Sequence, residues 1–366
     1  MRRLLERLYA PILRWKWGLS KRKARSIAHI FMGDYCSHKM KRRKIFSIHK
    51  SGFSVNDWRS ALLTKNNKDQ YLSTIQYHKM HPLNGEYTKW IDDKLTMKYL
   101  CAGTPLDTYM TRYFFLIDAK GIIHKMCDCP QAFAQGPSAE NVVSLLRSEC
   151  ELAFKLRSGS IGKGFYKAEY HDGSFYLNGS KFSEEDLIKK IKKLRDCLVV
   201  EYLKPHPDIA KFCPNVTNTI RYLSVKLDNR HVMLKSFVRF GTKKSGYVEN
   251  YNKGGILCYI DEQGVFTQGH SFDFSTGGDS IIQQHPDNQV RLHDTIPHWD
   301  DIQRCVASFH DYFPMLQYLG FDFVVTDKDE VKILEINSMT SLDSLQLEGS
   351  ILNSKYGEFF KQKLSK

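Results

Sequence analysis

The sequence lacks several features that would assign a function directly. It contains no run of about 18 apolar residues, and its N-terminus lacks the apolar core of a secretory signal. The nine cysteines are scattered and odd in number. The one close pair, Cys127 and Cys129, has no second pair to complete a zinc site. We therefore expect a cytoplasmic protein with reduced thiols.

The common catalytic motifs are also missing. No GxxxxGK[ST] segment is present, which excludes the usual P-loop for phosphate. No serine, cysteine or histidine stands in a nucleophile elbow or a triad signature. The sequence therefore does not predict a hydrolase with a covalent nucleophile.

Acidic residues are nearly absent from the first 50 positions. Residues 1–50 hold 15 lysines and arginines against only Glu6 and Asp34, whereas the remaining residues hold 39 basic and 38 acidic side chains. Nearly all of the net charge of +14 therefore belongs to an N-terminal arm. Because nucleic-acid binding more often spreads basic residues over the folded domain, we expect no nucleic-acid partner.

Apolar residues recur at helical spacing within this arm, and basic residues surround them. Leu4, Leu5, Leu8, Ile12 and Trp15 form the apolar series, and Pro11 is expected to kink or restart the helix. Two interpretations remain open. Residues 1–25 could contact an anionic membrane surface, or the helix could dock on the protein body with its basic face in water.

The rest of the chain predicts a globular α+β protein. Its 366 residues, 42% of them apolar and 13% aromatic, allow two or three domains with a sizeable core. Residues 138–203 read as helix, strand, glycine-rich loop, strand, helix and strand. Three further strand candidates and a final hairpin follow, so helices and mostly antiparallel strands are segregated.

Acidic residues interrupt the two apolar strands of that final hairpin, FDFVVTDKDEVKILEINS at 321–338. A two-residue turn at 328–329 predicts that Asp322 faces Glu335, with Asn337 on the same side. Facing carboxylates repel unless a cation lies between them, and two acids with an amide oxygen suit Mg²⁺. The alternative is an ordinary solvated face of the sheet.

Other candidate binding residues lie in strands. Lys155 stands in an apolar strand before a loop with Gly159, Gly162 and Gly164, and a buried lysine there requires an anion such as phosphate. The simpler interpretation of the loop is an ordinary hairpin.

Glu201 closes another apolar strand, whose exposed backbone could bind an adenine edge while Asp208 or His206 reaches sugar hydroxyls. The alternative is an ordinary exit from the strand into a loop. Arg221 and Arg239 occupy strand positions that suit a carboxylate or a transferring phosphoryl group, or a structural ion pair.

Taken in order, these motifs resemble the ATP-grasp superfamily, in which two α+β lobes sandwich ATP. The segments VTNTIRYLSV, VENYNKGGILCYID and HPDNQVRLHDTIPHWDDI are similar to sugar-transfer-associated ATP-grasp proteins of bacterial surface polysaccharide loci. The similarity covers roughly residues 90–350. It implies a lid subdomain at 138–203 and a C-terminal subdomain with the metal site at 204–366. The basic helical extension at 1–50 and a mixed helical region at 51–137 would precede them.

The resemblance implies a role for each motif. The residues implied to bind ATP are Lys94, Lys155, Ser158, Gly159, Ser160, Gly162, Gly164, Glu201, Tyr202 and Leu203, with Asp208 as the candidate for the sugar. The residues implied to bind Mg²⁺ are Asp322, Glu335 and Asn337. The residues implied to act at the reacting groups are Arg221, Arg239 and Asn252. One departure concerns the acceptor side: this chain reads INSMTSLDS where many ligases of the superfamily have a Pro-Gly turn.

The implied function is an ATP-dependent ligase. A small-molecule carboxylate would be activated as an acyl phosphate and joined to an amine or similar nucleophile on a sugar or glycan. The alternatives are a kinase of a sugar or lipid-linked glycan, and a membrane-associated binding protein with a degenerate ATP site. The expected location is the cytoplasm, with peripheral contact at the inner face of the membrane.

Overall fold

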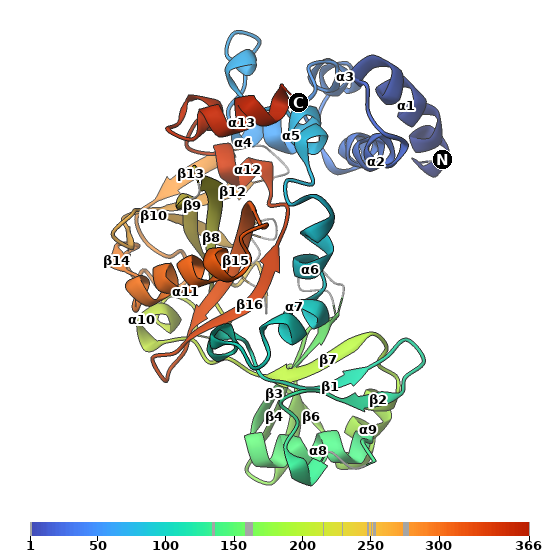
Figure 1. Ribbon diagram of the computed structural model, residues 1–366, viewed down its shortest axis with the longest axis vertical. Helices are drawn as coiled ribbons and strands as arrows, with labels where there is room; N and C mark the ends of the chain where they lie inside the picture. The colour runs from blue at the N-terminus through green and yellow to red at the C-terminus, as the bar shows by residue number, and fades with distance from the viewer. Residues whose placement is uncertain are drawn as a thin grey trace.

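The structure is a computed structural model, and it describes residues 2–133, 136–157, 164–214, 216–228, 230–246, 249, 251, 254–273 and 278–365. Figure 1 shows N-terminal and C-terminal helices at the top, a large sheet beneath them and a second sheet at the bottom. All nine cysteines are free thiols. No helix in the described ranges combines the length and apolar character needed to cross a bilayer.

Helices make up most of the first third of the chain. They are α1 (Arg2–Trp17), α2 (Lys21–Ser37), α3 (Arg42–Lys50), α4 (Val55–Ser60), α5 (Thr74–Met80), α6 (Thr88–Asp92) and α7 (Lys94–Cys101), with the 3₁₀ helices η1 (Lys68–Gln70), η2 (Gly85–Tyr87) and η3 (Pro105–Tyr109). Of the two outcomes expected at Pro11, a kink or a restart, the restart does not occur: α1 runs through Pro11 as one helix and packs on α2. Asp93 separates α6 from α7, and its side chain caps α7 by accepting from Thr96 N at 3.0 Å.

The first sheet has seven strands in the order β2-β1-β7-β3-β4-β5-β6. Its strands are β1 (Tyr113–Ile117), β2 (Ile123–Lys125), β3 (Glu151–Leu156), β4 (Tyr166–His171), β5 (Ser174–Leu177), β6 (Ser180–Phe182) and β7 (Cys197–Glu201). Helices α8 (Ala139–Glu149) and α9 (Glu184–Lys192) supply leucines and valines to its core, and η4 (Gln131–Phe133) precedes them. Because β1 and β2 belong to this sheet, it begins before residue 138, where the sequence placed the start of the lid.

The second sheet also has seven strands, in the order β13-β12-β10-β9-β8-β15-β16. Its strands are β8 (Thr219–Leu227), β9 (Arg230–Phe240), β10 (Ile256–Ile260), β12 (Gly269–Asp273), β13 (Gly278–Ile282), β15 (Tyr318–Val325) and β16 (Val331–Asn337). The remaining elements are a small sheet of β11 (Val265–Phe266) and β14 (Asp294–Thr295), and helices α10 (Pro207–Ala210), α11 (Trp299–Tyr312), α12 (Leu342–Gln346), η6 (Ile351–Asn353) and α13 (Gly357–Leu364). All described pairings in both large sheets are antiparallel, as expected for the predicted α+β class.

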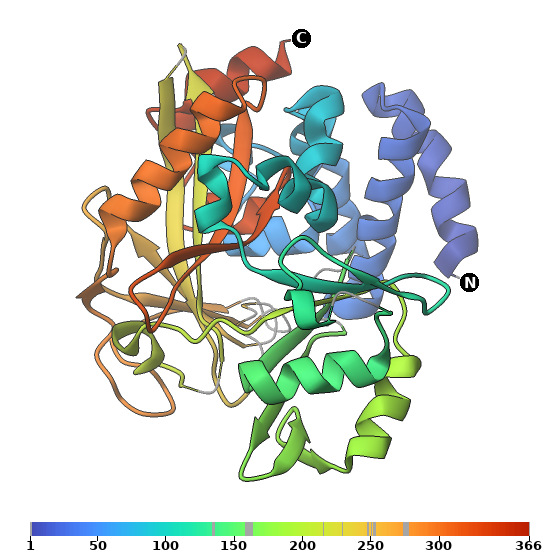
Figure 2. The same ribbon diagram turned by 60° about the horizontal axis from the view of Figure 1, so that its bottom comes forward.

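The two faces of the second sheet carry different residues. One face packs against α11, with Ile220, Val238 and Phe321 in the same buried cluster as Phe309 of that helix. Figure 2 shows α11 (orange) alongside strands β8 and β9. Since side chains alternate along a strand, Arg221, Arg239 and Asp322 lie on the opposite face. The site is therefore built on the side of the sheet away from α11.

The final hairpin has the predicted pairing of Asp322 with Glu335, but not the predicted turn. Thr326 N donates to Glu330 O at 2.8 Å, so three residues rather than two form the loop. A register shift between Asp322 and Phe323 then restores the pairing. Such a bulge inserts one extra residue into a strand, which compensates for the different loop length.

Candidate active site

Asp322 lies at the centre of the site and is held by two arginines from neighbouring strands. Arg221 of β8 stands directly beside Asp322 of β15, and its Nε and Nη2 donate to the two carboxylate oxygens at 2.5 and 2.8 Å. Arg239 of β9 adds a third contact, from Nη2 to Oδ1 at 2.9 Å. Only 3% of Asp322 is exposed. A carboxylate buried this far must be ionically paired, and bidentate arginine contacts are the strongest pairing available.

Glu335 faces Asp322 from β16 and binds a different cation. Its Oε2 lies 2.9 Å from Nζ of Lys94, the first residue of α7, and its Oε1 accepts from Asn337 Nδ2 at 3.3 Å. Burial opposes ionisation of Glu335, but Lys94 and Arg221 outweigh it and hold the pKa well below the usual range. The carboxylate is therefore charged at neutral pH.

Lys155 reaches the same place from the first sheet. Its Nζ donates to Leu334 O of β16 at 3.4 Å and stands 4.8 Å from the centre of the Tyr113 ring. Burial and the nearby Lys94 lower its pKa to about 7. In the described part of the chain no carboxylate forms an ion pair with Lys155, so an anionic ligand bound here would favour its charged form.

Two chain segments join the sheets beside these groups. The first leads into β1, where Met110 bridges to Ile333 of β16. The second leaves β7 after Glu201, and His206 N then donates to Val325 O at 2.8 Å. Arg112 ties the two segments together, because its backbone N and its Nε both donate to Glu201 at 2.8 Å. Glu201 therefore stabilises the connection between the two sheets, near which the sequence predicted that adenine binds.

The neighbours of Glu201 continue this connection. Leu203 is buried, and its carbonyl accepts from Thr217 Oγ1 at 3.4 Å. The ring of Tyr202 lies 4.4 Å from Lys167 Nζ. Asp208 stands apart on α10, where its exposed carboxylate lies 3.6 Å from His206 Nδ1. The adenine and sugar roles of these residues remain predictions.

The glycine-rich loop is described only at its end. Gly164 has φ +70°, a conformation that favours glycine, and an added Cβ would lie 2.8 Å from Leu156 Cγ. The predicted residues Ser158, Gly159, Ser160 and Gly162 lie outside the described residues, as does Asn252.

Two residues that contact Arg239, Thr219 and Glu249, were not predicted from the sequence. Thr219 Oγ1 accepts from Arg239 Nη2 at 2.6 Å and donates to Glu249 Oε1 at 3.0 Å. Arg239 also approaches Glu249 at 3.4 Å. Thr219 directly opposes Arg239 across the ladder, so a correct register of β8 and β9 could have found it. No local signal marks Glu249.

The three predicted metal ligands match Mg²⁺ in chemistry. Asp322 and Glu335 are ionised oxygen donors on facing strands, and the Asn337 amide group points its nitrogen at Glu335, which leaves its oxygen available. Each carboxylate has lone pairs beyond those used by its present partners. Among the described residues no set of three His, Cys, Asp or Glu side chains is arranged for a metal, so the amide and the nucleotide would complete the ligands.

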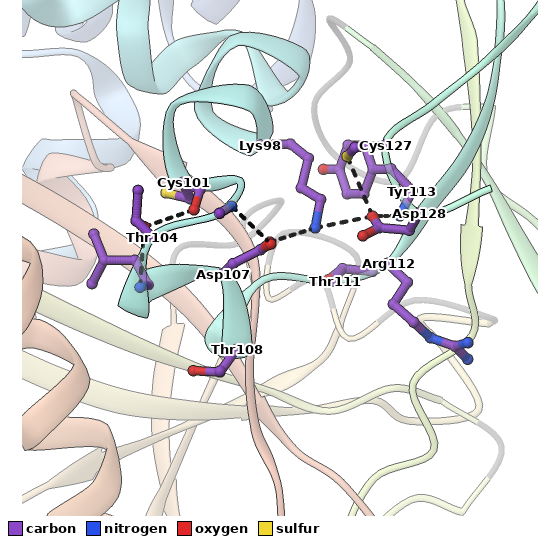
Figure 3. Close-up of polar contacts among 12 residues, drawn as sticks. Lys98, Cys101, Thr104, Asp107, Thr108, Thr111, Arg112, Tyr113, Cys127 and Asp128 are labelled. Carbon is purple, nitrogen blue, oxygen red and sulfur yellow. Dashed lines mark hydrogen bonds and ion pairs between the residues drawn. The ribbon is translucent and has the colours of Figure 1, made fainter. Parts of the chain in front are cut away.

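A buried lysine network stands behind the site. Lys98 of α7 is 1% exposed, and its Nζ lies 2.8 Å from Asp107 and 2.9 Å from Asp128. Figure 3 shows the ammonium between the two carboxylates, with Tyr113 beside Asp128. Asp128 also accepts from Tyr113 N at 2.6 Å. Because the Tyr113 ring faces Lys155, the network positions one wall of the site.

We predict that Lys98→Met lowers the free energy of unfolding by about 3 kcal/mol, because two carboxylates lose their shared cation. Urea denaturation would measure the loss. Neutralising both partners with Asp107→Asn and Asp128→Asn in the same chain should recover part of it. Lys125→Met, at an exposed lysine of β2, serves as the control. If Lys98→Met and Lys125→Met had the same urea midpoint, the lysine network would not stabilise the fold as predicted.

Comparisons with known proteins assign the chain to a family. A family model described as sugar-transfer associated ATP-grasp matches residues 76–358. No curated protein matches. Solved structures similar to this chain include D-alanyl-alanine synthetase A from Vibrio cholerae O1, with 13% identity, a TM-score of 0.43 and coverage of 75% of this chain and 65% of that one. The chain thus spans less than two thirds of that synthetase.

Two other similar structures are the ATP-grasp ligase PsnB, at 12% identity, and a biotin carboxylase domain of the Hydrogenobacter thermophilus 2-oxoglutarate carboxylase, at 10%. Their TM-scores are 0.38 and 0.34. The alignments cover 84% and 71% of this chain, and 72% and 42% of the respective structures. Identities this low carry no information on substrates. The family model, in contrast, spans most of the sequence, and the chain belongs to the sugar-transfer associated ATP-grasp family.

Proposed function

We propose that the protein is an ATP- and Mg²⁺-dependent ligase. It would activate a carboxylate as an acyl phosphate and join it to an amine or similar nucleophile on a sugar or glycan of a bacterial surface polysaccharide. Family membership supports ATP-dependent chemistry of the ligase type. The carboxylate, the acceptor and the pathway are parts of the proposal.

One observation carries this proposal: cations from both sheets converge where the sheets meet. Lys155 comes from the first sheet, Arg221 and Arg239 come from the second, and Lys94 comes from the helix between them. They surround three carboxylates, Asp322, Glu335 and Glu249. The site thus has four basic side chains and three carboxylates, and Lys155 has no carboxylate partner in the described part of the chain. This is expected of a lysine that binds phosphate when no nucleotide is present.

The proposed chemistry assigns these side chains to charge neutralisation and alignment. A carboxylate oxygen would attack the terminal phosphorus of ATP, the bond to the ADP oxygen would break, and an acyl phosphate would form. An amine would then attack the acyl carbon and expel phosphate, with loss of one proton from the nitrogen. Lys94 and Lys155 would hold phosphate oxygens, and Arg221 and Arg239 would stabilise the transferring group. Mg²⁺, held by Asp322, Glu335 and Asn337, would supply further neutralisation of phosphate charge.

We propose a cytoplasmic location at the inner face of the membrane, where ATP is supplied and the nine thiols remain reduced.

The acceptor side is the part of the site that this chain builds differently from many ligases. The segment after Asn337 leads into α12, where Leu342 and Leu345 are buried and pack with residues of the second sheet. Substrate selectivity would therefore differ from that of ligases with a Pro-Gly turn at this position.

Hydroxylamine trapping tests this function without knowledge of the natural amine. The purified protein would be incubated with ATP, Mg²⁺, hydroxylamine and a set of carboxylic acids, and hydroxamates would be detected by mass spectrometry. We expect one carboxylate class to give hydroxamate with equal amounts of ADP and free phosphate. A phosphorylated sugar with no free phosphate would instead identify a kinase. Absence of ATP binding at millimolar nucleotide would reject both enzymatic functions.

A further inference from the structure

Helix α1 has two apolar faces, and only one of them is covered. Ala10 and Leu13 are buried, and they pack with Phe31 of α2 in one cluster. The other face is exposed: Trp15 is 87% accessible and Leu8 is 62% accessible. Its members are Leu4, Leu5, Leu8, Ile12 and Trp15. In the described part of the chain nothing covers this second face.

Helical geometry makes these exposed residues one continuous stripe. At 100° per residue, Leu4, Trp15 and Leu8 fall within about 40° of one another, and Ile12 and Leu5 continue the same side. Soluble proteins rarely expose a contiguous apolar patch of this kind, and such patches mark contact surfaces. The docked-helix interpretation of the sequence explains the first face of α1 and leaves this second face without a function.

Basic side chains border the stripe on both sides. Arg3, Arg7 and Arg14 are exposed along one edge, and Lys16 is exposed along the other. The neighbouring helices add further exposed cations, among them Arg22 and Arg25 of α2 and Arg42 to Lys44 of α3. Phe46 of α3 is also 57% accessible. The apolar stripe of α1 is therefore bordered by exposed cations of the same helix, and α2 and α3 add more positive charge to the N-terminal helices.

We propose that α1 docks on the surface of an anionic lipid bilayer. Leu4, Leu8 and Trp15 would enter the headgroup and acyl boundary, and the basic rim would meet anionic headgroups. A second copy of this chain fits less well, because two arms of +13 each would repel. Nucleic acid fits less well too, since it would leave the apolar stripe in water.

Docking through α1 would also place the two ends of the molecule differently relative to the bilayer. Figure 1 shows α1 at one end of the long axis and the first sheet at the other. The N-terminal helices are tied to α12 by two hydrogen bonds between the Gln346 side chain and the backbone of Leu72, both 2.9 Å. Docking would therefore bring α12 toward the bilayer and leave the first sheet, with Lys155, in solution. Such an orientation suits an acceptor presented at a membrane surface.

Vesicle cosedimentation of the full-length protein tests the inference. We expect binding to vesicles with about 30% anionic lipid, weak binding to zwitterionic vesicles, and weaker binding at high salt. Leu8→Ser with Trp15→Ser should reduce binding about tenfold or more. Because both side chains are exposed, this variant is expected to fold, which circular dichroism and ATP binding would verify.

A matched variant removes exposed apolar side chains elsewhere: Ile122→Ser with Tyr312→Ser. It should bind anionic vesicles like the unaltered protein. Equal vesicle binding by the α1 variant would overturn the proposal, and so would the absence of vesicle binding by the unaltered protein. Light scattering that shows a dimer lost in the α1 variant, without vesicle binding, would assign the stripe to self-association instead. None of these outcomes depends on ligase activity, so they test the proposed membrane location separately from the proposed reaction.

Discussion

Replacing Glu335 with glutamine is expected to lower ATP turnover about a thousandfold, because the site loses one of its two facing carboxylates. The amide keeps the shape of the side chain but cannot neutralise Lys94, which lies 2.9 Å away. The same change removes the charge on which Mg²⁺ binding at this position would depend. ATP affinity in the absence of Mg²⁺ should fall much less, since the four cations of the site remain.

Steady-state release of ADP at varied Mg²⁺ would measure this effect. A control on the same hairpin is Glu330→Gln, at a half-exposed carboxylate whose contact with Lys332 is 3.7 Å long. This control should retain normal turnover. Thermal denaturation would establish that both variants are folded. Glu335→Gln turnover close to that of the control, at ordinary Mg²⁺, would show that the proposed metal assignment is wrong.

The pairing of the final hairpin could be predicted from the sequence because period-2 alternation constrains it strongly. A slip of one residue would move Asp322 into the face that packs on α11, so burial selects the register. The loop length was predicted incorrectly, since a bulge between Asp322 and Phe323 absorbs the extra residue. A bulge has no reliable local sequence signal. The alternation of buried apolar residues along the strands on either side of it is such a signal.

The immediate partners of the site residues could not be predicted in the same way. Arg221 and Arg239 were each identified as strand arginines, but their convergence on Asp322 requires β9, β8 and β15 to be adjacent in that order. Glu249 and Lys94 come from a loop and a helix, and only the folded chain brings them near the ladder. The local sequence pattern therefore identified candidate side chains. Which of them contact one another depends on the order of the strands in the sheet.

The second large effect is expected at Lys155. Lys155→Ala should weaken ATP binding about 10- to 100-fold near neutral pH, because one charge-assisted contact to phosphate is lost. Among the described residues, Lys155 is the one cation that the first sheet contributes to the site, so its loss would also remove a contact between that sheet and a bound nucleotide. Lys181→Ala, at an exposed lysine of β6 in the same sheet, should leave affinity unchanged. Calorimetric titration with a nonhydrolysable ATP analogue would measure both.

The pH dependence of binding separates a phosphate contact from a structural role for Lys155. Its pKa is lowered to about 7 by burial and by Lys94, so the side chain is charged below that pH and increasingly neutral above it. Binding an anionic phosphate favours the ammonium, so above pH 7 the complex must take up a proton and the Kd for ATP should rise with pH. In Lys155→Arg the guanidinium stays charged throughout, and the rise should disappear. Proton uptake measured above pH 7.5 in buffers of different ionisation enthalpy would detect the difference, and an identical pH profile for the two proteins would exclude Lys155 from the phosphate site.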